Sequence, residues 1–250
     1  MFGGLMRSKL NIAVEPVAAL RRVGNSNAPT TVGVALLAEL GGTAWVQYDL
    51  RGEHRVENER DARLLRASLN TALDLVLATG PDMLDLAFAI RPDRLTLAPE
   101  RRVGAATMDT LDAQTNREAL RKQILHIQDT GIDVAVRIEA ELEQVKALHH
   151  AEAAVAVLNA DAFASASSAK GRSQEFTRIG DAASLAHRLK LSVAVNGDLT
   201  LQEVEALARI PQISEFQVGH ACLARAVLRG MEAAVKDFQA AIDRGRWRVG

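Results

Sequence analysis

The chain of 250 residues has little of several features that define other protein classes. Its one cysteine, Cys222, excludes an internal disulfide and a metal site built from cysteine pairs, and it fits a small buried residue. The formal net charge is −1 at pH 7, so no basic excess points to nucleic acid or to an acidic membrane surface. No apolar run approaches the roughly 18 residues of a membrane span. A globular protein that binds neither nucleic acid nor membrane is expected.

The first ten residues lack a long apolar segment and a small-residue cleavage pattern, so we expect no signal peptide and a cytoplasmic location. Apolar residues make up 48% of the chain and charged residues 24%, which is the usual balance of a soluble domain. At this length the chain fits two small domains or one α/β barrel.

The dominant pattern is an alternation of short apolar runs with longer segments of helical periodicity. The near-continuous apolar character of the runs is typical of parallel strands buried on both faces. We predict strands at 10–15, 43–50, 73–79, 94–100, 132–139, 153–159, 191–197 and 215–220. Eight strand–helix units predict one TIM (β/α)8 barrel, with a few extra helices, as a single domain over residues 1–250.

An open doubly wound sheet is the rival architecture, but its first strand-to-helix turn would show a glycine-rich fingerprint, which is absent here. Glycines at 41–42 predict a helix end, and Thr200 with Glu203 predicts a capping box. Long loops are expected at 101–116 and 160–174, and one long helix at about 221–242.

In a TIM barrel the reactive groups lie where strands end. Polar residues do follow the predicted strands, and together they indicate a ligand site at this mouth. They are Glu15, Asp49, Arg51, Thr79, Glu100, Arg101, Arg102, Arg137, Glu139, Asn159, Asn196, Asp198, Gly219 and His220. No histidine spacing matches a metal site, and no GxSxG nucleophile elbow is present.

Gly219-His220 separates the eighth predicted strand from an apolar helix. A helix that begins after a glycine presents its first N–H groups and positive dipole end to an anion, although an ordinary tight turn has the same sequence. Barrels often bind phosphate after strands seven and eight, which favours a phosphate-bearing ligand here. Arg21, Arg51 and Arg101 are candidate cationic donors to it.

Over residues 10–242 the chain resembles the pyridoxine 5′-phosphate synthase family of vitamin B6 biosynthesis. The resemblance rests on VAALR (17–21), DLRGEHR (49–55), ERDARLLR (59–66), LTLAPERR (95–102), LSVAVNGDLT (191–200) and VGHACLARAVLRGMEAAV (218–235). It implies a barrel with extra helices that assembles as a homo-oligomer, from dimers up to an octamer. The implied reaction condenses 1-deoxy-D-xylulose 5-phosphate with 3-amino-2-oxopropyl phosphate without a metal or organic cofactor.

The resemblance assigns substrate or phosphate binding to matching positions of this chain: Arg21, Arg51, Glu100, Thr107, Gly219 and His220. The family's proton-transfer positions differ here. Asp49 stands where a histidine is expected, Val76 where a carboxylate is expected, and Gly197 where a second histidine is expected. Loss of one general acid or base costs about 10²–10⁴-fold in rate, so substitutes are needed for turnover. The candidates are Asp49, Glu15 and Asp198.

Three functions remain open on the sequence alone. The first is the family's condensation, or a related one, performed with a rebuilt acid–base set. The second is a phosphate-ligand-binding protein without turnover. The third is a partner subunit of a true synthase. The retained phosphate-binding positions favour a small phosphorylated ligand in all three.

Overall fold

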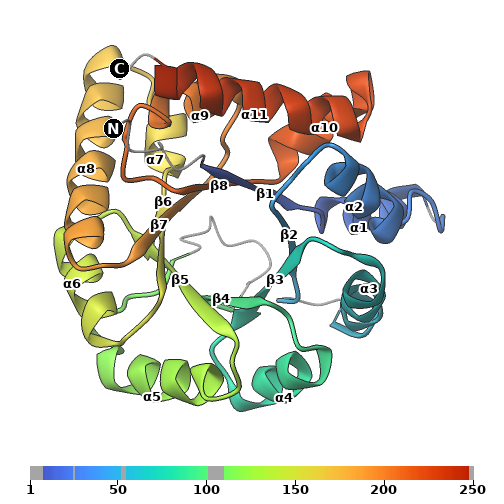
Figure 1. The fold of residues 1–250 in the computed structure, drawn as a ribbon, viewed down its shortest axis with the longest axis horizontal. Coiled ribbons are helices and arrows are strands. Elements are labelled where there is room, and N and C mark those ends of the chain that lie inside the picture. Colours follow the sequence, from blue (N-terminus) through green and yellow to red (C-terminus); the bar gives the residue numbers. More distant parts are fainter. Residues whose placement is uncertain (1–7, 25, 52–54, 101–109, 248–250) are drawn as a thin grey trace, which may run out of the picture.

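The structure, a computed structural model, describes residues 8–24, 26–51, 55–100 and 110–247. All eight predicted strands are present, and each is followed by one or more helices (Figure 1). In chain order the elements are β1 (Lys9–Ala13), α1 (Pro16–Gly24), α2 (Thr31–Leu40), β2 (Trp45–Asp49), α3 (Arg55–Ser68), β3 (Ala72–Ala78), α4 (Pro81–Ile90), β4 (Arg94–Ala98), α5 (Arg117–Gln128), β5 (Asp133–Glu139), α6 (Leu142–His150), β6 (Val155–Asn159), α7 (Asp161–Ala164), α8 (Ala169–Arg188), β7 (Ser192–Asn196), α9 (Leu201–Leu207), β8 (Glu215–Val218), α10 (His220–Arg229) and α11 (Met231–Trp247).

The strands form a closed barrel in the order β1 to β8, and every neighbouring pair is parallel. The barrel closes because β1 also pairs with β8, with Leu10 opposite Phe216. Figure 1 looks down the barrel and shows the helices as a ring around it. The predicted TIM barrel is therefore confirmed, and the open doubly wound sheet is excluded. A single domain over residues 1–250 stays a prediction.

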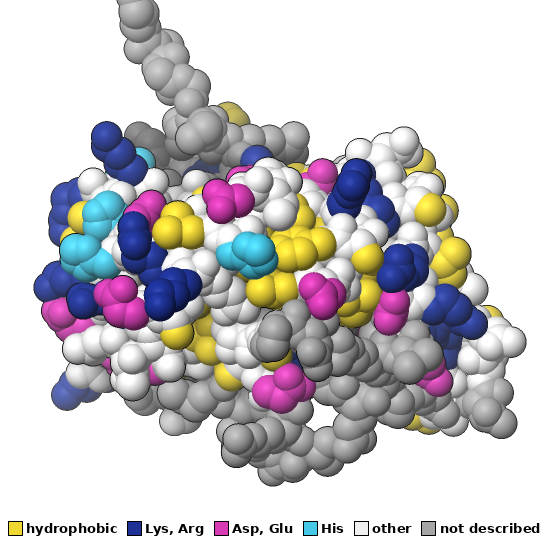
Figure 2. Space-filling model, turned by 90° about the horizontal axis from the view of Figure 1, so that it is seen from below, with side chains coloured by type: hydrophobic (Ala, Val, Ile, Leu, Met, Phe, Trp, Pro, Cys, Tyr) yellow, Lys and Arg dark blue, Asp and Glu magenta, His cyan; other side chains and the backbone are white. Residues whose placement is uncertain are grey.

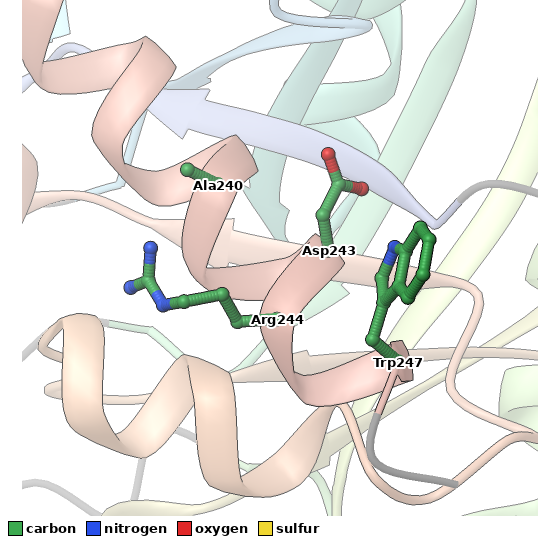
Figure 3. A pocket seen from close by; sticks show the side chains of 4 residues that line it. All are labelled: Ala240, Asp243, Arg244 and Trp247. Carbon is green, nitrogen blue, oxygen red and sulfur yellow. The ribbon is translucent and has the colours of Figure 1, made fainter. Parts of the chain in front are cut away.

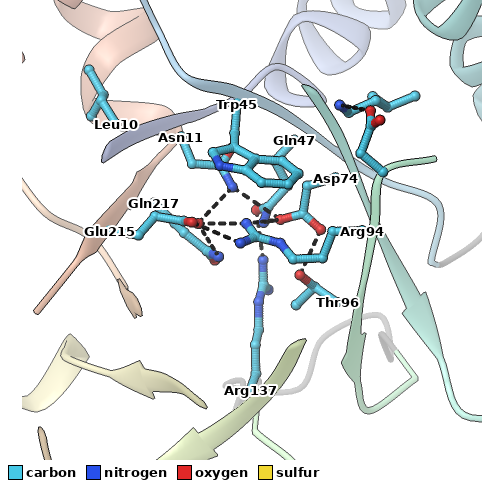
Figure 4. A network of polar contacts seen from close by, with 12 residues as sticks. Leu10, Asn11, Trp45, Gln47, Asp74, Arg94, Thr96, Arg137, Glu215 and Gln217 are labelled. Carbon is cyan, nitrogen blue, oxygen red and sulfur yellow. Dashed lines mark hydrogen bonds and ion pairs between the residues drawn. The ribbon is translucent and has the colours of Figure 1, made fainter. Parts of the chain in front are cut away.

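Alternate side chains of each strand face opposite sides of the barrel wall. In β3, Leu73, Leu75 and Leu77 belong to the large apolar core shared with the outer helices. The residues between them, such as Asp74, face the lumen, as Figure 4 shows. Burial of both faces explains why these strands read as apolar runs in the sequence.

The lumen is filled differently on its two sides. Near β5, β6 and β7 it holds a small apolar cluster of Ala135, Val155, Val157 and Ala194. Near β8 and β1 to β4 it holds a network of buried polar side chains (Figure 4). The polar members are Asn11, Gln47, Asp74, Arg94, Thr96, Glu215 and Gln217, with Arg137 joined from β5.

Arg94 is the centre of this lumen network. Its Nη1 lies 2.8 Å from Glu215 Oε2, and its Nη2 lies 2.8 Å from Asp74 Oδ2 and 2.6 Å from Glu215 Oε1. The guanidinium also stacks on Trp45, with Cζ 4.2 Å from the ring centroid. One cation thus ties β4 to β2, β3 and β8. Because all these groups are buried, each charge depends on its partners for stabilisation.

Burial alone would raise the pKa of Asp74, but the charge of Arg94 and hydrogen bonds from Arg94, Gln47 and Thr96 lower it below its ordinary value of 3.8. The folded protein therefore binds the Asp74 proton more weakly than the unfolded chain. Its contribution to the unfolding free energy is full above the ordinary pKa and is lost as the pH falls below it.

Three kinds of local prediction were wrong, and the first concerns strand ends: β1, β4 and β8 each end two residues earlier than predicted. β1 ends at Ala13 rather than at Glu15, because Pro16 opens α1 and lacks a ladder N–H, and the chain already turns where Val17 N bonds Val14 O. The tract 160–174 is not a loop: it contains α7 and the start of α8, because alanines favour helix and Ser168 caps α8 by accepting a bond from Gly171 N.

The third wrong prediction is the single helix at 221–242. The chain forms α10 and α11 instead, separated by Gly230 with φ of 79°, which is a left-handed conformation that favours glycine. The helix end at Gly41-Gly42 and the capping box of Thr200 with Glu203 are confirmed. Of the predicted loop 101–116, residues 101–109 lie outside the described part of the chain.

Replacing Arg94 with methionine should lower the unfolding free energy at pH 7 by about 3–5 kcal/mol, because Asp74 and Glu215 would be left buried without a cation. The loss should shrink as the pH is lowered, because protonation of Asp74 removes a buried charge that Arg94 compensates in wild type. Urea unfolding of the variant and of wild type measures both effects.

The matched control is Arg66→Met, which breaks an exposed pair with Asp93 and should cost about 0–1 kcal/mol. Equal losses from the two substitutions would show that the lumen network does not stabilise the barrel.

Candidate functional site

Asp49 and Arg51 lie together at the carboxyl end of β2, where a barrel carries its site. Arg51 Nε lies 3.0 Å from Asp49 Oδ1, and Arg51 Nη2 lies 2.6 Å from Asp49 Oδ2. The backbone N–H of Arg51 also bonds Asp49 Oδ1. Both side chains are buried, so they form one charge-compensated unit. A substrate anion at Arg51 meets the Asp49 carboxylate as well.

The same arginine joins the ends of two strands, since Arg51 Nη1 donates to Pro99 O at 2.8 Å, just after β4. Glu100, the next residue, is exposed. Thr107, together with Arg101 and Arg102, lies outside the described residues.

Arg21 belongs to a cluster on the outer side of the barrel wall. Arg21 forms an ion pair with Asp61 of α3, whose carboxylate also accepts a bond from Thr31 Oγ1 at 2.7 Å. This cluster surrounds Tyr48, which faces the outer core rather than the lumen. Burial and then the charge of Asp61 raise the pKa of Tyr48, and the charges of Arg21 and Glu15 act on the same phenol.

Gly219 and His220 form the junction between β8 and α10. Gly219 is the N-cap residue of α10 and supplies no side-chain cap. The N–H of Cys222 bonds Gly219 O at 3.0 Å, which leaves the N–H groups of His220 and Ala221 at the helix start for a ligand. A Cβ at position 219 would lie 3.2 Å from Ala13 Cβ, which is tighter than ordinary contact. Glycine thus lets the turn lie against the end of β1. His220 is the exposed first residue of α10.

Position 197, where the resembled family would have a histidine, is closely packed. Gly197 has φ of 137°, and a Cβ there would lie 2.8 Å from Asp161 Oδ1 and 3.1 Å from Asp161 N. Asp161 Oδ1 also accepts the N–H of the exposed Asp198 at 2.8 Å. The first residue of α7 therefore occupies the space that a side chain at 197 would need.

Glu139 at the end of β5, one of the strand-end residues expected at the mouth, is the centre of a second polar cluster. Its Oε1 accepts from Asn159 Nδ2 at 3.0 Å and from Thr110 Oγ1 at 3.1 Å, and Arg178 Nη1 lies 3.6 Å from its Oε2. These contacts join the ends of β5 and β6 to the segment before α5. Arg137, two residues earlier, crosses the lumen to Gln47 Oε1 at 3.0 Å.

In the sequence, these residues can be recognised as polar residues within otherwise apolar strands. Val76 faces the lumen from β3 but is fully buried and cannot transfer a proton. Asn196 of β7 and Gln217 of β8 also face the lumen, because the residues directly before them, Val195 and Phe216, face the outer core.

The described residues offer neither a metal site nor a reactive thiol. None of their histidine, cysteine and acidic side chains forms a group of three that could hold a metal ion. Burial raises the pKa of the Cys222 thiol to about 12, so it packs as predicted and stays protonated. No helix in the described ranges is both long and apolar enough to cross a membrane.

On the face drawn in Figure 2, basic and acidic side chains are interspersed, so charge of one sign does not dominate it. A surface hollow on α11 is lined by Ala240, Asp243, Arg244 and Trp247 (Figure 3). A second hollow is lined by Asp243 as well and by Ser8 and Lys9 at the start of β1. The two hollows therefore lie at the opposite end of the barrel from the mouth.

Gly197→Ala should lower the unfolding free energy by about 2–4 kcal/mol, because it combines a left-handed conformation with a steric clash against Asp161. The control is Gly131→Ala, where φ is 81° but no atom would lie within 4 Å of the added methyl group, so only about 1 kcal/mol is expected. Denaturant unfolding of the two variants decides this, and equal costs would show that α7 does not restrict position 197.

Comparison with known proteins places this geometry in a family. Residues 10–244 match the family model described as pyridoxal phosphate biosynthesis protein PdxJ. The pyridoxine 5′-phosphate synthase of Desulforapulum autotrophicum is 35% identical over 94% of this chain and 98% of its own length. That of Thermosynechococcus vestitus is 36% identical over 93% and 98%.

Solved structures at low identity share the fold alone. Phosphoribosyl anthranilate isomerase from Thermotoga maritima has a TM-score of 0.61 at 14% identity and covers 94% of this chain and 98% of its own. The 3-hexulose-6-phosphate synthase from Salmonella typhimurium has a TM-score of 0.62 at 13% identity, over 95% and 100%. Because the family model and these relatives match it over nearly its whole length, the chain belongs to the PdxJ family of pyridoxal phosphate biosynthesis proteins.

Proposed function

We propose that this chain binds small phosphorylated substrates at the barrel mouth and catalyses a PdxJ-type condensation. The substrates are 1-deoxy-D-xylulose 5-phosphate and 3-amino-2-oxopropyl phosphate, or close relatives, and the acid–base set is rebuilt. Membership of a family whose relatives are named pyridoxine 5′-phosphate synthase supports the reaction class. The observation that carries the proposal is the Gly219-His220 junction at the start of α10, at the mouth.

Phosphate binding follows from the physics of this junction. The first N–H groups of a helix lack intrahelical partners, and the helix dipole places positive potential at the same end. Gly219 supplies no side-chain cap to α10, and the turn has no Cβ to hold a ligand away. Arg51, at the end of β2 on the same face of the barrel, is a proposed cation for the ligand and is already paired with Asp49.

The rebuilt acid–base set has one exposed member. Asp198 is exposed beside Gly197, and its backbone N–H is held by Asp161, which fixes its position. Asp49 is buried and bonded to Arg51, and the charge of Glu15 acts on the buried phenol of Tyr48. We therefore propose Asp198 as the first substitute for the missing histidines, with Asp49 second and Glu15 third.

The second candidate function is a phosphate-ligand-binding protein without turnover, acting alone or as a partner subunit of a true synthase. Buried Val76 and the closed position at Gly197 favour it, because two proton-transfer positions of the family have no side chain that can transfer a proton. A cytoplasmic location and a reaction without metal or organic cofactor stay predictions from the sequence.

We propose that the chain forms a homo-oligomer built from dimers, on the basis of exposed apolar side chains on α1, α2 and α10, which we call the apolar helix patch. Leu20 and Val23 of α1, Leu40 of α2, and Val227 and Leu228 of α10 are exposed on helices that contact one another through α1. Exposed apolar groups of this kind mark interaction surfaces. We propose a second copy of this chain as the occupant.

His220→Glu should weaken binding of inorganic phosphate and of 1-deoxy-D-xylulose 5-phosphate at least about tenfold, because a carboxylate would repel the anion at the start of α10. The fold should tolerate it, since acidic residues suit the first turn of a helix. Calorimetric titration measures both affinities. Ala169→Glu, the same charge at the start of α8, should leave binding unchanged. Absence of heat with wild type would contradict phosphate binding.

Turnover is tested by incubating wild type with both phosphorylated substrates and assaying pyridoxine 5′-phosphate. Product is expected for the synthase. Binding without product at high enzyme concentration would contradict the parental reaction and favour the second candidate function.

The double substitution Val227→Glu with Leu228→Glu should convert the oligomer to smaller species, as measured by light scattering coupled to size exclusion. Leu142→Glu, on α6 away from the patch and 45% exposed, should leave the mass unchanged. A monomeric wild-type protein would contradict the assembly.

A further inference from the structure

Three buried amide oxygens in the lumen lack hydrogen-bond partners: Asn196 Oδ1, Gln217 Oε1 and Asn11 Oδ1. They come from the consecutive strands β7, β8 and β1. Asn11 pairs with Gln217 in the sheet register, and Val195 pairs with Phe216, so one residue further along Asn196 lies beside Gln217. Neighbouring strands lie about 4.8 Å apart, so these oxygens form one row.

The hydrogen bonds of Gln217 and Asn11 determine which atom of each amide is the oxygen. Gln217 Nε2 donates to Glu215 Oε1 at 3.1 Å, and Asn11 Nδ2 donates to Glu215 Oε1 and Asp74 Oδ2. Carboxylates that bond Arg94 accept rather than donate, so each amide must turn its nitrogen toward them. The remaining atom is therefore a carbonyl oxygen, which requires a donor.

Asn196 is the member closest to the mouth, as the last residue of β7. It is 9% exposed, and its side chain takes part in no hydrogen bond within the described structure. Asn159, the same residue type at the end of neighbouring β6, has both ends of its amide occupied, by Glu139 and by the N–H of Asp161. A buried amide without partners costs stability, so it points to a group supplied from outside the fold.

We propose that Asn196 and Gln217 form a subsite that accepts hydrogen bonds from hydroxyl or amino groups of a bound phosphate ester. The inference rests on the proposed phosphate site and deepens it. Gln217 lies two residues before Gly219, so the ligand's phosphate at the start of α10 and its donor groups at the row would belong to one small molecule. A ligand without a donor would leave Gln217 Oε1 unpaired and would bind more weakly.

Two phosphate esters of the same length test the subsite by calorimetry: glycerol 3-phosphate, which carries hydroxyl groups, and propyl phosphate, which does not. Wild type should prefer glycerol 3-phosphate at least about tenfold. Asn196→Leu and Gln217→Met should remove most of this preference while affinity for inorganic phosphate is retained. Equal affinities of wild type for the two esters would overturn the subsite.

Thermal unfolding provides a readout without ligand. Asn196→Leu should raise the Tm by about 2–4 °C, because it removes an unpaired buried amide. Asn159→Leu, the matched control, should lower the Tm because it breaks two bonds. A fall in Tm for Asn196→Leu would contradict an unpartnered amide.

In the binding experiment, failure of inorganic phosphate and both esters to bind wild type would overturn the proposed phosphate site and this subsite together. Binding of all three without a preference between the esters would overturn the subsite alone.

Discussion

Arg94 lies in the barrel lumen between the carboxylates of Asp74 and Glu215, and the rest of the structure is arranged around that contact. It joins strands that are far apart in sequence, with β4 and β8 separated by 121 residues at the Arg94–Glu215 pair. Asn11, Gln47, Thr96 and Gln217 use the remaining acceptor positions of the two acids. The network fixes which way each amide points, and so determines which polar atoms remain for a ligand above it.

Much of the fold was predictable from the sequence because parallel barrel strands are buried on both faces and read as apolar runs. Helix ends at Gly41-Gly42 and Thr200 were predictable because glycine and capping residues act locally. The tract 160–174 was not, because its small residues suit both a loop and a helix. The grouping of site residues also failed to follow from sequence. Strand ends predict a shared mouth, yet the pairing of Arg21 with Asp61 depends on how α1 and α3 each pack beside α2.

The proposed site combines a helix start that we expect to bind an anion with positions that differ from the proton-transfer residues of the resembled family. Gly219 is glycine because the turn lies against Ala13, and Gly197 is glycine because α7 occupies the adjoining space. The first feature favours binding of a phosphate, whereas the second prevents simple restoration of a histidine. Family membership therefore supports the class of substrate more directly than it supports each step of the reaction. The row of amide oxygens from Asn196 to Asn11 adds a lumen surface that selects ligands by their donors.

The most direct measurement is a crystal structure of the protein with 1-deoxy-D-xylulose 5-phosphate bound. We predict that the phosphate lies against the first N–H groups of α10 at Gly219 and His220, with ligand hydroxyl groups directed to Asn196 and Gln217. A ligand bound away from this mouth, or a phosphate that makes no contact with the start of α10, would contradict the proposed site.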